Sequence, residues 1–270
     1  VVDFEESILL DTVRATTRLW KLGDKIVGFA YLDDYYNLRF ETDPGYPLAQ
    51  LENEIIAWGT TCMRDRNAKT GKNHSMDSSC DANHAQRIAL LEKHGFVRDP
   101  QFTLHYTHSL SDPLAEHPLP GGFAFRCVEG EEEVDDLVRL HQAAFGTKNM
   151  TVEQRLAIMY TPGYVRELDL VVTTSEGALA AFCICGLEEA APGRLIGTTD
   201  PIGTHPNYRR RGLGKAIVTA GMQILKDRGA AVAALGTSSD NLPMQRLAES
   251  LGFICESRTI WFSKEITHAK

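Results

Sequence analysis

The sequence has little of what marks several common protein classes. Its six cysteines form no C-x-x-C pair, and such pairs are the usual mark of zinc sites and redox motifs. Its apolar runs fall short of the roughly 20 residues that a membrane span needs. No basic-then-apolar leader opens it. We therefore expect a cytoplasmic protein with reduced thiols, without a metal ion and without a membrane partner.

Positive charge is also scarce. Lysine and arginine number 28 against 36 aspartates and glutamates, which gives the 270 residues a net charge of −8 at pH 7. Proteins that bind nucleic acid are typically basic, so we expect no nucleic-acid partner. The chain is long enough for two domains, each with a hydrophobic core. We expect it to act as a monomer or a weak dimer.

One stretch is strongly basic and rich in glycine. Residues 204–216 read THPNYRRRGLGKA, and an apolar helix pattern follows directly. Gly212 and Gly214 allow the backbone to come close to a bound group. The first amides of a helix have no partners within the helix, and they lie at the positive end of its dipole. This stretch is therefore suited to a diphosphate.

The spacing of its glycines excludes the two best-known phosphate loops. A dinucleotide fingerprint needs a third glycine where Ile217 stands, and a Walker loop needs one where Arg209 stands. A glycine pair after basic residues is by itself equally consistent with a solvated turn. Other motifs have to decide between these interpretations.

Several motifs together resemble one enzyme superfamily. Residues 209–214 (RRRGLG) resemble the R/Q-x-x-G-x-G/A loop of the GNAT superfamily of acyl-CoA-dependent N-acetyltransferases, and residues 205–209 resemble the x-P-x-Y-R run that precedes it in many members. The residues that resemble the second motif block of that family are Asn241, Leu247 and 251–253 (LGF). The resemblance covers about residues 122 to 266.

The expected elements follow the GNAT order in the C-terminal half. There we expect strands over 123–128, 167–173, 178–186, 194–204, 230–237 and 253–264, with helices over 131–145, 151–160, 213–227 and 243–250. In the N-terminal half we expect strands over 16–22, 25–33, 36–42, 75–80, 96–97 and 102–106, helices over 48–62 and 82–94, and irregular structure over 64–74.

The two halves also resemble each other. Residues 87–96 (RIALLEKHGF) and 244–253 (MQRLAESLGF) match in register, and the strands and long helix before them recur in order. A stretch rich in proline and glycine, 109–122, provides the best linker. We therefore predict domains over 1–117 and 118–270.

The repeat predicts an α/β fold of two tandem GNAT-like domains, each a mixed, mainly antiparallel sheet flanked by helices. The N-terminal copy is incomplete and degenerate, because it lacks the first strand and two helices. At the place of the phosphate loop it has 46–51 (YPLAQL), without a glycine pair or arginines. This layout is similar to the mycothiol synthase family.

The resemblance implies that acetyl-CoA, or another acyl-CoA, is the co-substrate, with no metal ion. The residues that it assigns to cofactor binding are Ile202, Thr204, Arg209, Arg210, Arg211, Gly212, Leu213, Gly214, Lys215 and Asn241. The amide of Ile202 would in addition polarise the thioester carbonyl, as a one-donor oxyanion site.

A catalytic base is less well marked. In a regular strand the even-numbered residues from 198 to 204 share one face, so Asp200 could lie beside the thioester and relay a proton from the amine through water. The alternative is an aspartate that forms a turn before Pro201. Glu188 and Glu189 compete for the role, although such a pair is more often simply solvated.

The general acid departs from the family pattern. Many members have a tyrosine after the helix leucine, but here Ala248 follows it. Solvent could protonate the thiolate, another hydroxyl could serve, or the domain could bind without turnover. The hydroxyls considered are those of Ser238, Ser239 and Tyr208, the last more suited to packing under the loop. We expect His141 and His205 to be structural rather than catalytic.

These observations favour an acyl-CoA-dependent N-acyltransferase that transfers acetyl to the amine of a small molecule. The alternative is a catalytically weak module that binds acyl-CoA in a sensing or scaffolding role. A protein-interaction domain that binds neither ligand is the third hypothesis.

Overall fold

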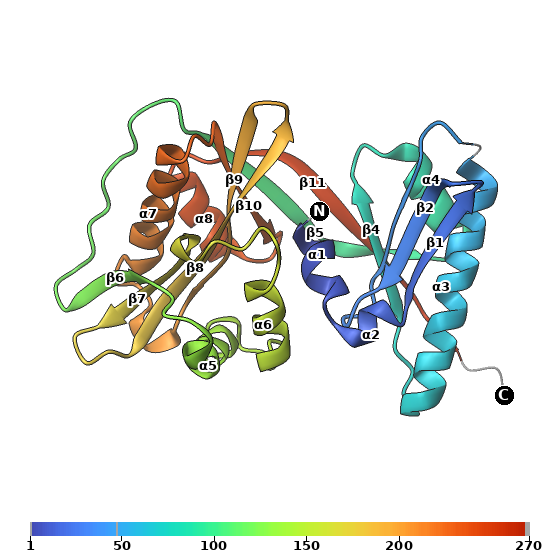
Figure 1. The fold of residues 1–270 in the computed structure, drawn as a ribbon, viewed down its shortest axis with the longest axis horizontal. Coiled ribbons are helices and arrows are strands. Elements are labelled where there is room, and N and C mark those ends of the chain that lie inside the picture. Colours follow the sequence, from blue (N-terminus) through green and yellow to red (C-terminus); the bar gives the residue numbers. More distant parts are fainter. Residues whose placement is uncertain (1, 47, 268–270) are drawn as a thin grey trace. The chain divides into compact units, whose positions relative to one another are not determined.

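The computed structural model describes residues 2–46 and 48–267 of the chain (Figure 1). These residues divide into two compact units. Unit 1 consists mainly of Leu104–Glu256, together with the start of the chain through Glu6. Unit 2 consists of Ser7–Thr103 and the chain from Ser257 onward.

Unit 1 is a sheet with helices against both faces. Its elements are β6 (Phe123–Cys127), α5 (Val134–Phe145), α6 (Val152–Met159), β7 (Asp169–Thr174), β8 (Leu179–Ala191), β9 (Arg194–Thr204), α7 (Leu213–Asp227), β10 (Val232–Ser238) and α8 (Leu242–Ser250). Strands β6 to β9 are antiparallel neighbours, whereas β10 pairs with β9 in parallel. The expected order of elements in this half is confirmed.

Local sequence sets the ends of the first two helices of unit 1. Helix α6 begins with a capping box, in which the Gln154 amide donates to the Thr151 hydroxyl at 3.2 Å and the Thr151 amide donates to the Gln154 side chain at 3.0 Å. Helix α5 ends at Gly146, whose φ of 68° is in the left-handed region that favours glycine.

Unit 2 has a smaller sheet of its own. Its elements are α2 (Asp11–Arg14), β1 (Thr17–Leu22), β2 (Lys25–Leu32), β3 (Leu38–Thr42), α3 (Leu48–Thr70), β4 (Met76–Asp81) and α4 (Ala85–Lys93). Strands β1, β2 and β3 pair antiparallel in that order. A further short helix, α1 (Val2–Ile8), opens the chain. The strand predicted to be missing from this half has no counterpart among the described residues.

Two details of the N-terminal half were predicted wrongly. Two short helices precede β1, although the sequence indicated none. Helix α3 continues to Thr70 instead of ending at 62, because Met63 and Asn67 extend its buried face. The strand expected over 75–80 is confirmed as β4, where the Ser78 hydroxyl donates to the Leu38 carbonyl at 3.0 Å and so satisfies a buried polar group.

Two long strands are each divided between the units. Strand β5 (Val97–Ser109) belongs to unit 2 as far as Thr103 and to unit 1 from Leu104. Strand β11 (Ile254–Lys264) belongs to unit 1 as far as Glu256 and to unit 2 from Ser257. Each unit therefore contains a strand segment from the opposite half of the sequence. The closing strands expected at 96–106 form one continuous strand.

The strand order shows where these segments lie. In unit 1 the order from β6 to β10 continues with β5 and then β11. In unit 2 the later part of β11 pairs antiparallel with β4, with Trp261 opposite Ser79. The compact units thus divide the chain at other points than the predicted boundary at 117/118, which stays a prediction about the sequence repeat.

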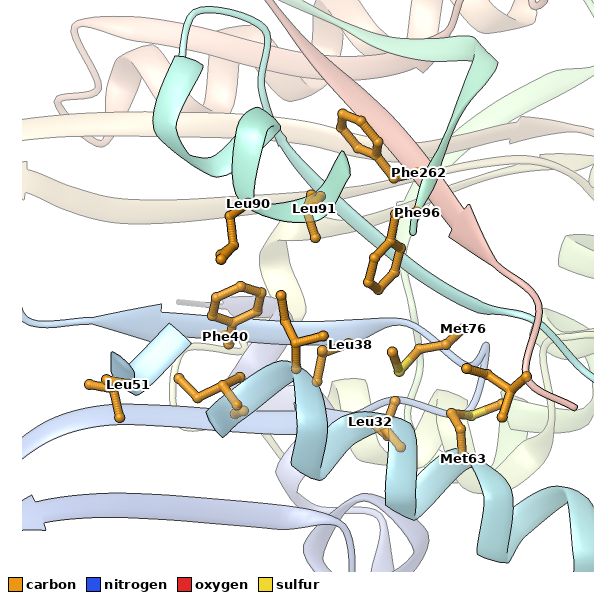
Figure 2. Close-up of a cluster of buried hydrophobic side chains, with 14 of the residues drawn as sticks. Leu32, Leu38, Phe40, Leu51, Met63, Met76, Leu90, Leu91, Phe96 and Phe262 are labelled. Carbon is orange, nitrogen blue, oxygen red and sulfur yellow. The ribbon is translucent and has the colours of Figure 1, made fainter. Parts of the chain in front are cut away.

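The core of unit 2 depends on the segment that comes from the C-terminus. Figure 2 shows Phe262 of β11 beside Phe96 and Leu91, above the side chains of β3 and α3. Phe262 is fully buried, with 0% of its surface exposed. The chain is therefore unable to complete this core until its last strand is in place.

We predict that Phe262→Ala destabilises unit 2 by about 3–5 kcal/mol, as expected for a large core aromatic. Urea denaturation followed by tryptophan fluorescence would measure this, because Trp20, Trp58 and Trp261 all lie in unit 2. Val97→Ala is the control, since Val97 is 71% exposed and should change the stability by less than about 0.5 kcal/mol. Equal midpoints for the two variants would contradict the role assigned to Phe262.

Candidate functional site

The parallel strands β9 and β10 of unit 1 are paired over only part of their length. Their register joins Ile196–Thr198 to Val232–Ala234. Beyond that point β9 continues to Thr204 and β10 to Ser238, with no further pairing between them among the described residues. An opening between two strands therefore starts at about residue 199.

A β-bulge in β9 lies at the same point. Cys183 of β8 pairs with Ile202 and Cys185 pairs with Thr199, so three residues of β8 lie opposite four residues of β9. Bulges of this kind bend a strand and change the face on which later side chains lie. The bulge therefore falls on Asp200 and Pro201.

This bulge overturns the expectation of one shared face along 198–204. A Cβ built on Gly197 would meet Leu225 of α7 at 2.6 Å, so Gly197 faces α7, and Thr198 faces the other side. A Cβ on Gly203 would meet Ala144 of α5 at 2.8 Å, so Gly203 faces α5. Its neighbours 202 and 204 therefore face α7. Thr198 and the pair 202/204 lie on opposite faces.

The backbone of the last part of β9 is directed by its pairing with β8. The amide of His205 donates to the Ala180 carbonyl at 2.9 Å, and successive residues of a strand direct their amides to alternate sides. The polar backbone groups of Ile202 and Thr204 therefore point away from β8, toward the side where β10 has separated. This is the side expected for the Ile202 amide if it polarises a bound carbonyl.

The basic glycine loop adopts the predicted turn between a strand and a helix. A short 3-10 turn (Pro206–Tyr208) follows β9, and α7 begins at Leu213. Arg210 and Gly212 have φ angles of 63° and 84°, both in the left-handed region. Gly212 precedes the helix without a side-chain cap, which leaves the first amides of α7 available to an anion.

Lys215 adds positive charge in the first turn of α7. No acidic residue lies in that turn, although acids are favoured at helix N-termini and cations are not. A lysine in this place costs stability unless an anion binds near it. Gly214 serves helix packing as well, because a Cβ there would meet Leu247 of α8 at 2.8 Å.

The three loop arginines are placed differently from one another. The Arg209 guanidinium donates to the carbonyls of Thr204, at 3.2 Å, and Ala144, at 2.6 Å. Arg211 lies over the rings of Tyr208 and Phe123, at 5.7 and 5.9 Å from their centroids. Arg210 makes no ion pair and no side-chain hydrogen bond with the described residues. Tyr208 is thus a packing residue, as expected.

Asn241 and Ala248 lie on the neighbouring helix α8. The Asn241 side chain caps this helix by accepting from the Met244 amide at 3.3 Å, so its amide nitrogen stays available as a donor. Ala248 is fully buried and offers no hydroxyl where many family members have a tyrosine. The Ser238 hydroxyl accepts from the Asp240 amide at 3.3 Å and keeps its own proton to donate.

Asp200 lies where the two strands separate. Its carboxylate accepts from the Gly236 amide of β10 at 3.3 Å, and Thr199 donates to the Ala234 carbonyl at 3.5 Å next to it. The carboxylate is at the surface, so a ligand could reach it. Asp200 therefore has a structural role at the point where β9 and β10 separate. It is also exposed, as a catalytic base needs to be.

Other candidates from the sequence lie away from this opening. Glu188 and Glu189 pair with Ile196 and Leu195 at the far end of the β8–β9 hairpin, about 20 Å along the strand from Ile202 at 3.3 Å per residue. The Glu189 carboxylate accepts from the turn amide of Gly193 at 2.7 Å. Both glutamates are therefore too distant to act as the base.

The two suspected histidines have structural contacts. His205 accepts from the Asn207 amide at 3.2 Å and so starts the 3-10 turn. His141 stacks between Phe145 and Phe182, with ring centroids 4.6 and 5.5 Å away. Burial, aided by the charge of Arg155, lowers the pKa of His141 to about 4. A histidine this weakly basic is neutral at pH 7 and poorly suited to take a proton from an amine.

The structure also contains a buried polar cluster that the sequence did not reveal. Arg155 of α6 pairs with Asp169 at the head of β7, and the Tyr164 hydroxyl donates to the same carboxylate at 2.8 Å. Burial raises the pKa of Asp169, against the effect of Arg155. The cluster fixes α6 and the segment after it to the sheet. In the sequence, the only sign of this cluster is that Arg155 and Asp169 are charged residues within apolar segments.

The opening between β3 and β4 of unit 2 corresponds to the one in unit 1 but is filled. Here Arg87 is only 7% exposed. Its guanidinium donates to the Phe40 carbonyl at 3.2 Å and lies 3.8 Å above the Phe40 ring, with Glu52 at 3.5 Å. The backbone edge that faces the opening in unit 1 is therefore occupied by a side chain in unit 2. The predicted loop equivalent, 46–51, includes Pro47, which lies outside the described residues.

Two kinds of feature are absent from residues 2–46 and 48–267. No helix there is both long and apolar enough to cross a membrane. No three histidine, cysteine, aspartate or glutamate side chains there gather closely enough to hold a metal ion.

Comparisons with known proteins agree with the geometry of unit 1. Residues 134–253 match the model of the acetyltransferase (GNAT) family. The chain is 27% identical over 188 residues to the mycothiol acetyltransferase of a Nocardioides species, an alignment that covers 63% of this chain and 62% of that protein. The chain thus spans less than two thirds of that relative's length.

Solved structures show the same fold across nearly the whole chain. A GCN5-related N-acetyltransferase from Sphaerobacter thermophilus has a TM-score of 0.73 at 19% identity, over 94% of this chain and 82% of its own. A tandem GNAT protein from the clavulanic acid biosynthesis pathway has a TM-score of 0.68 at 15% identity, over 100% of this chain and 89% of its own. The chain therefore has the tandem GNAT fold, and its residues 134–253 match the GNAT acetyltransferase family.

Proposed function

We propose that the protein transfers an acetyl group from acetyl-CoA to the amine of a small molecule. The observation that supports this best is the opening between β9 and β10, which has the Ile202 and Thr204 backbone on one side and the uncapped start of α7 at its end. An extended pantetheine arm can pair with such a strand edge, and a diphosphate suits such a helix start.

Different residues of the loop would supply hydrogen-bond donors and positive charge to the diphosphate. The amides of Leu213, Gly214 and Lys215 supply neutral donors, and Arg210 with Lys215 supplies charge, since neither is paired with a described residue. Acetyl-CoA would also remove the cost of a lysine at the helix N-terminus, because its diphosphate supplies the anion that this turn lacks. Asn241 has a free amide donor for the pantetheine side.

Acyl transfer forms a bond from the amine nitrogen to the carbonyl carbon and breaks the carbon–sulfur bond. The Ile202 amide would stabilise negative charge on the carbonyl oxygen. The amine must lose a proton, and Asp200, exposed where β9 and β10 separate, would take it through a water molecule. The Ser238 hydroxyl at the end of β10 would donate its proton to the departing thiolate and take another from solvent.

The alternative is a module that binds acyl-CoA with little turnover. Ala248 supports it, because a buried methyl group replaces the hydroxyl that many family members use as general acid. Incubating the protein with acetyl-CoA and a panel of alkylamines, amino sugars and amino acids separates the two. Thiol release with acetylated product supports the transferase, and binding without release supports the module.

We predict that Lys215→Glu stabilises the free protein but weakens its binding of acetyl-CoA. Replacing the cation by an anion improves the interaction with the α7 dipole by about 0.5–1 kcal/mol, so the melting temperature should rise. The added carboxylate repels the diphosphate, so the dissociation constant for acetyl-CoA should rise about tenfold or more.

Arg228→Glu is the matched control at the other end of α7. It changes the net charge equally, but it should lower the stability of the free protein and leave acetyl-CoA affinity unaltered. Thermal melts with and without acetyl-CoA measure both effects. Unchanged acetyl-CoA affinity in Lys215→Glu would count against the proposed diphosphate site.

We predict that each chain binds one acetyl-CoA. Unit 2 holds Arg87 in the place where unit 1 has an open strand edge, and its 46–51 segment lacks a basic glycine loop. Isothermal titration calorimetry should give a stoichiometry near one. Lys215→Glu should lower the affinity of this single binding event and leave no second event behind. A second binding event that survives Lys215→Glu would refute the assignment of Arg87.

A third prediction separates the two roles of Asp200. An asparagine can still accept from the Gly236 amide, whereas an alanine cannot. If Asp200 is the base, Asp200→Asn and Asp200→Ala should both lower turnover by about 10²-fold or more at unchanged acetyl-CoA affinity. The loss should shrink as pH rises, because the amine then loses its proton without help.

A purely structural role gives a different pattern. Asp200→Ala would melt at a lower temperature, Asp200→Asn would resemble the parent, and turnover per folded molecule would change little in either. Melting temperature, acetyl-CoA affinity and the pH profile of turnover should be measured on the same preparations. A folded Asp200→Asn variant with full activity at pH 7 would remove Asp200 from the reaction.

A further inference from the structure

The end of helix α5 lies directly on the strand that faces the proposed acyl donor. A Cβ on Gly203 would be 2.8 Å from the Ala144 Cβ and would also overlap the Phe182 ring. Gly203 therefore lets the last turn of α5 approach β9 between Ile202 and Thr204. The position of that turn is tied to the two residues that face the opening.

Arg209 holds the same turn from the side of the glycine loop. Its Nη2 donates to the Ala144 carbonyl at 2.6 Å, and its Nε donates to the Thr204 carbonyl at 3.2 Å. Carbonyls in the last turn of a helix have no partner within the helix, and a cation there is favourable. One guanidinium thus joins the end of α5, the end of β9 and the start of the loop.

The neighbouring arginines make no such connection. Arg211 lies over two aromatic rings, 5.7 and 5.9 Å from their centroids. Arg210 is exposed and makes no ion pair with the described part of the chain. The resemblance assigned all three arginines to cofactor binding. Of the three, only Arg209 donates to two backbone carbonyls, those of Ala144 and Thr204, which are 60 residues apart in the chain.

We propose that Arg209 is a positioning residue that couples the acyl-CoA loop to the acceptor side of the site, rather than a ligand of the diphosphate. The segment held by Arg209 continues through Gly146 into Met150 and the start of α6, on the α5 face of β9. Helix α7 packs on the other face of β9, which leaves the α5 face for the approach of an amine to the carbonyl held at Ile202. This step rests on the proposed function.

The coupling has a direct consequence for the free protein. Without the Arg209 donors, the Ala144 carbonyl loses its only described side-chain partner. The last turn of α5 keeps its packing against Gly203 and Phe182 and the hydrogen bonds of Gln142 with Gly146, Thr147 and Met150. That turn should then open more often, although the loop amides of α7 are unchanged. The effect should appear in the segment around 143–150 and not in the first turn of α7.

The experiment compares Arg209→Met, Arg209→Lys and the adjacent control Arg210→Met. Hydrogen exchange of the segment 143–150 is measured with and without saturating acetyl-CoA, together with acetyl-CoA affinity at two salt concentrations. The KM is measured for the amine of the panel that gives the highest turnover. Arg209→Met keeps most of the side-chain stem and removes the donors, whereas Arg209→Lys restores one donor.

We expect Arg209→Met to speed exchange in 143–150 about tenfold, as for the loss of a hydrogen bond to a charged donor. Its acetyl-CoA affinity should stay within about threefold of the parent's, with the same salt dependence, while the amine KM rises about fivefold or more. Arg209→Lys should recover part of both effects. Arg210→Met should instead weaken the binding of acetyl-CoA and make that binding less dependent on salt. It should leave hydrogen exchange in 143–150 unchanged.

The opposite pattern overturns the proposal. Arg209→Met would then weaken acetyl-CoA as Arg210→Met does, with normal exchange in 143–150. Faster exchange with an unchanged amine KM would refute the acceptor-side role as well. A parent protein that does not bind acetyl-CoA would refute the proposed function itself. Hydrogen exchange in 143–150 tests the Arg209 contacts without depending on enzymatic activity.

Discussion

The separation of β9 from β10 is the constraint on which the proposed site depends. A strand in a sheet normally has both edges paired, so a free edge exists only where something prevents pairing. Here the bulge at 200–201 and the contact of Asp200 with the Gly236 amide mark the point of divergence. Beyond it, the backbone of Ile202 and Thr204 is directed to an unpaired side, and the β9 chain runs on into the loop that starts α7.

Each strand beside this opening needs support from its other edge. Strand β9 has β8, with pairing that continues through Thr204. Strand β10 has β5 as its neighbour in the strand order, and the part of β5 in unit 1, Leu104–Ser109, comes from the N-terminal half of the sequence. The opening of the C-terminal domain is therefore bounded with the help of the degenerate copy.

The sequence predicted most of unit 1 and the basic glycine turn between β9 and α7, because these follow local rules. Glycine spacing, the capping box at Thr151 and the apolar periods each act within a few residues. The missed features are of longer range. The bulge in β9 depends on β8, the contact of Arg209 with Ala144 joins residues far apart, and the length of α3 depends on the burial of Asn67. Periodicity reports none of these, since each is decided by a partner elsewhere in the chain.

The exchanged strands also suggest why a copy without a phosphate loop persists. Unit 2 has Arg87 in its own opening and so offers no obvious place for a second acyl-CoA, yet its sequence supplies Leu104–Ser109 to the sheet of unit 1. The C-terminal half of the sequence likewise supplies Phe262 of β11 to the core of unit 2. Neither predicted domain, 1–117 or 118–270, contains all the strands of its own unit. The sheet of unit 1 therefore needs the last strand of the N-terminal copy, although that copy has no phosphate loop of its own.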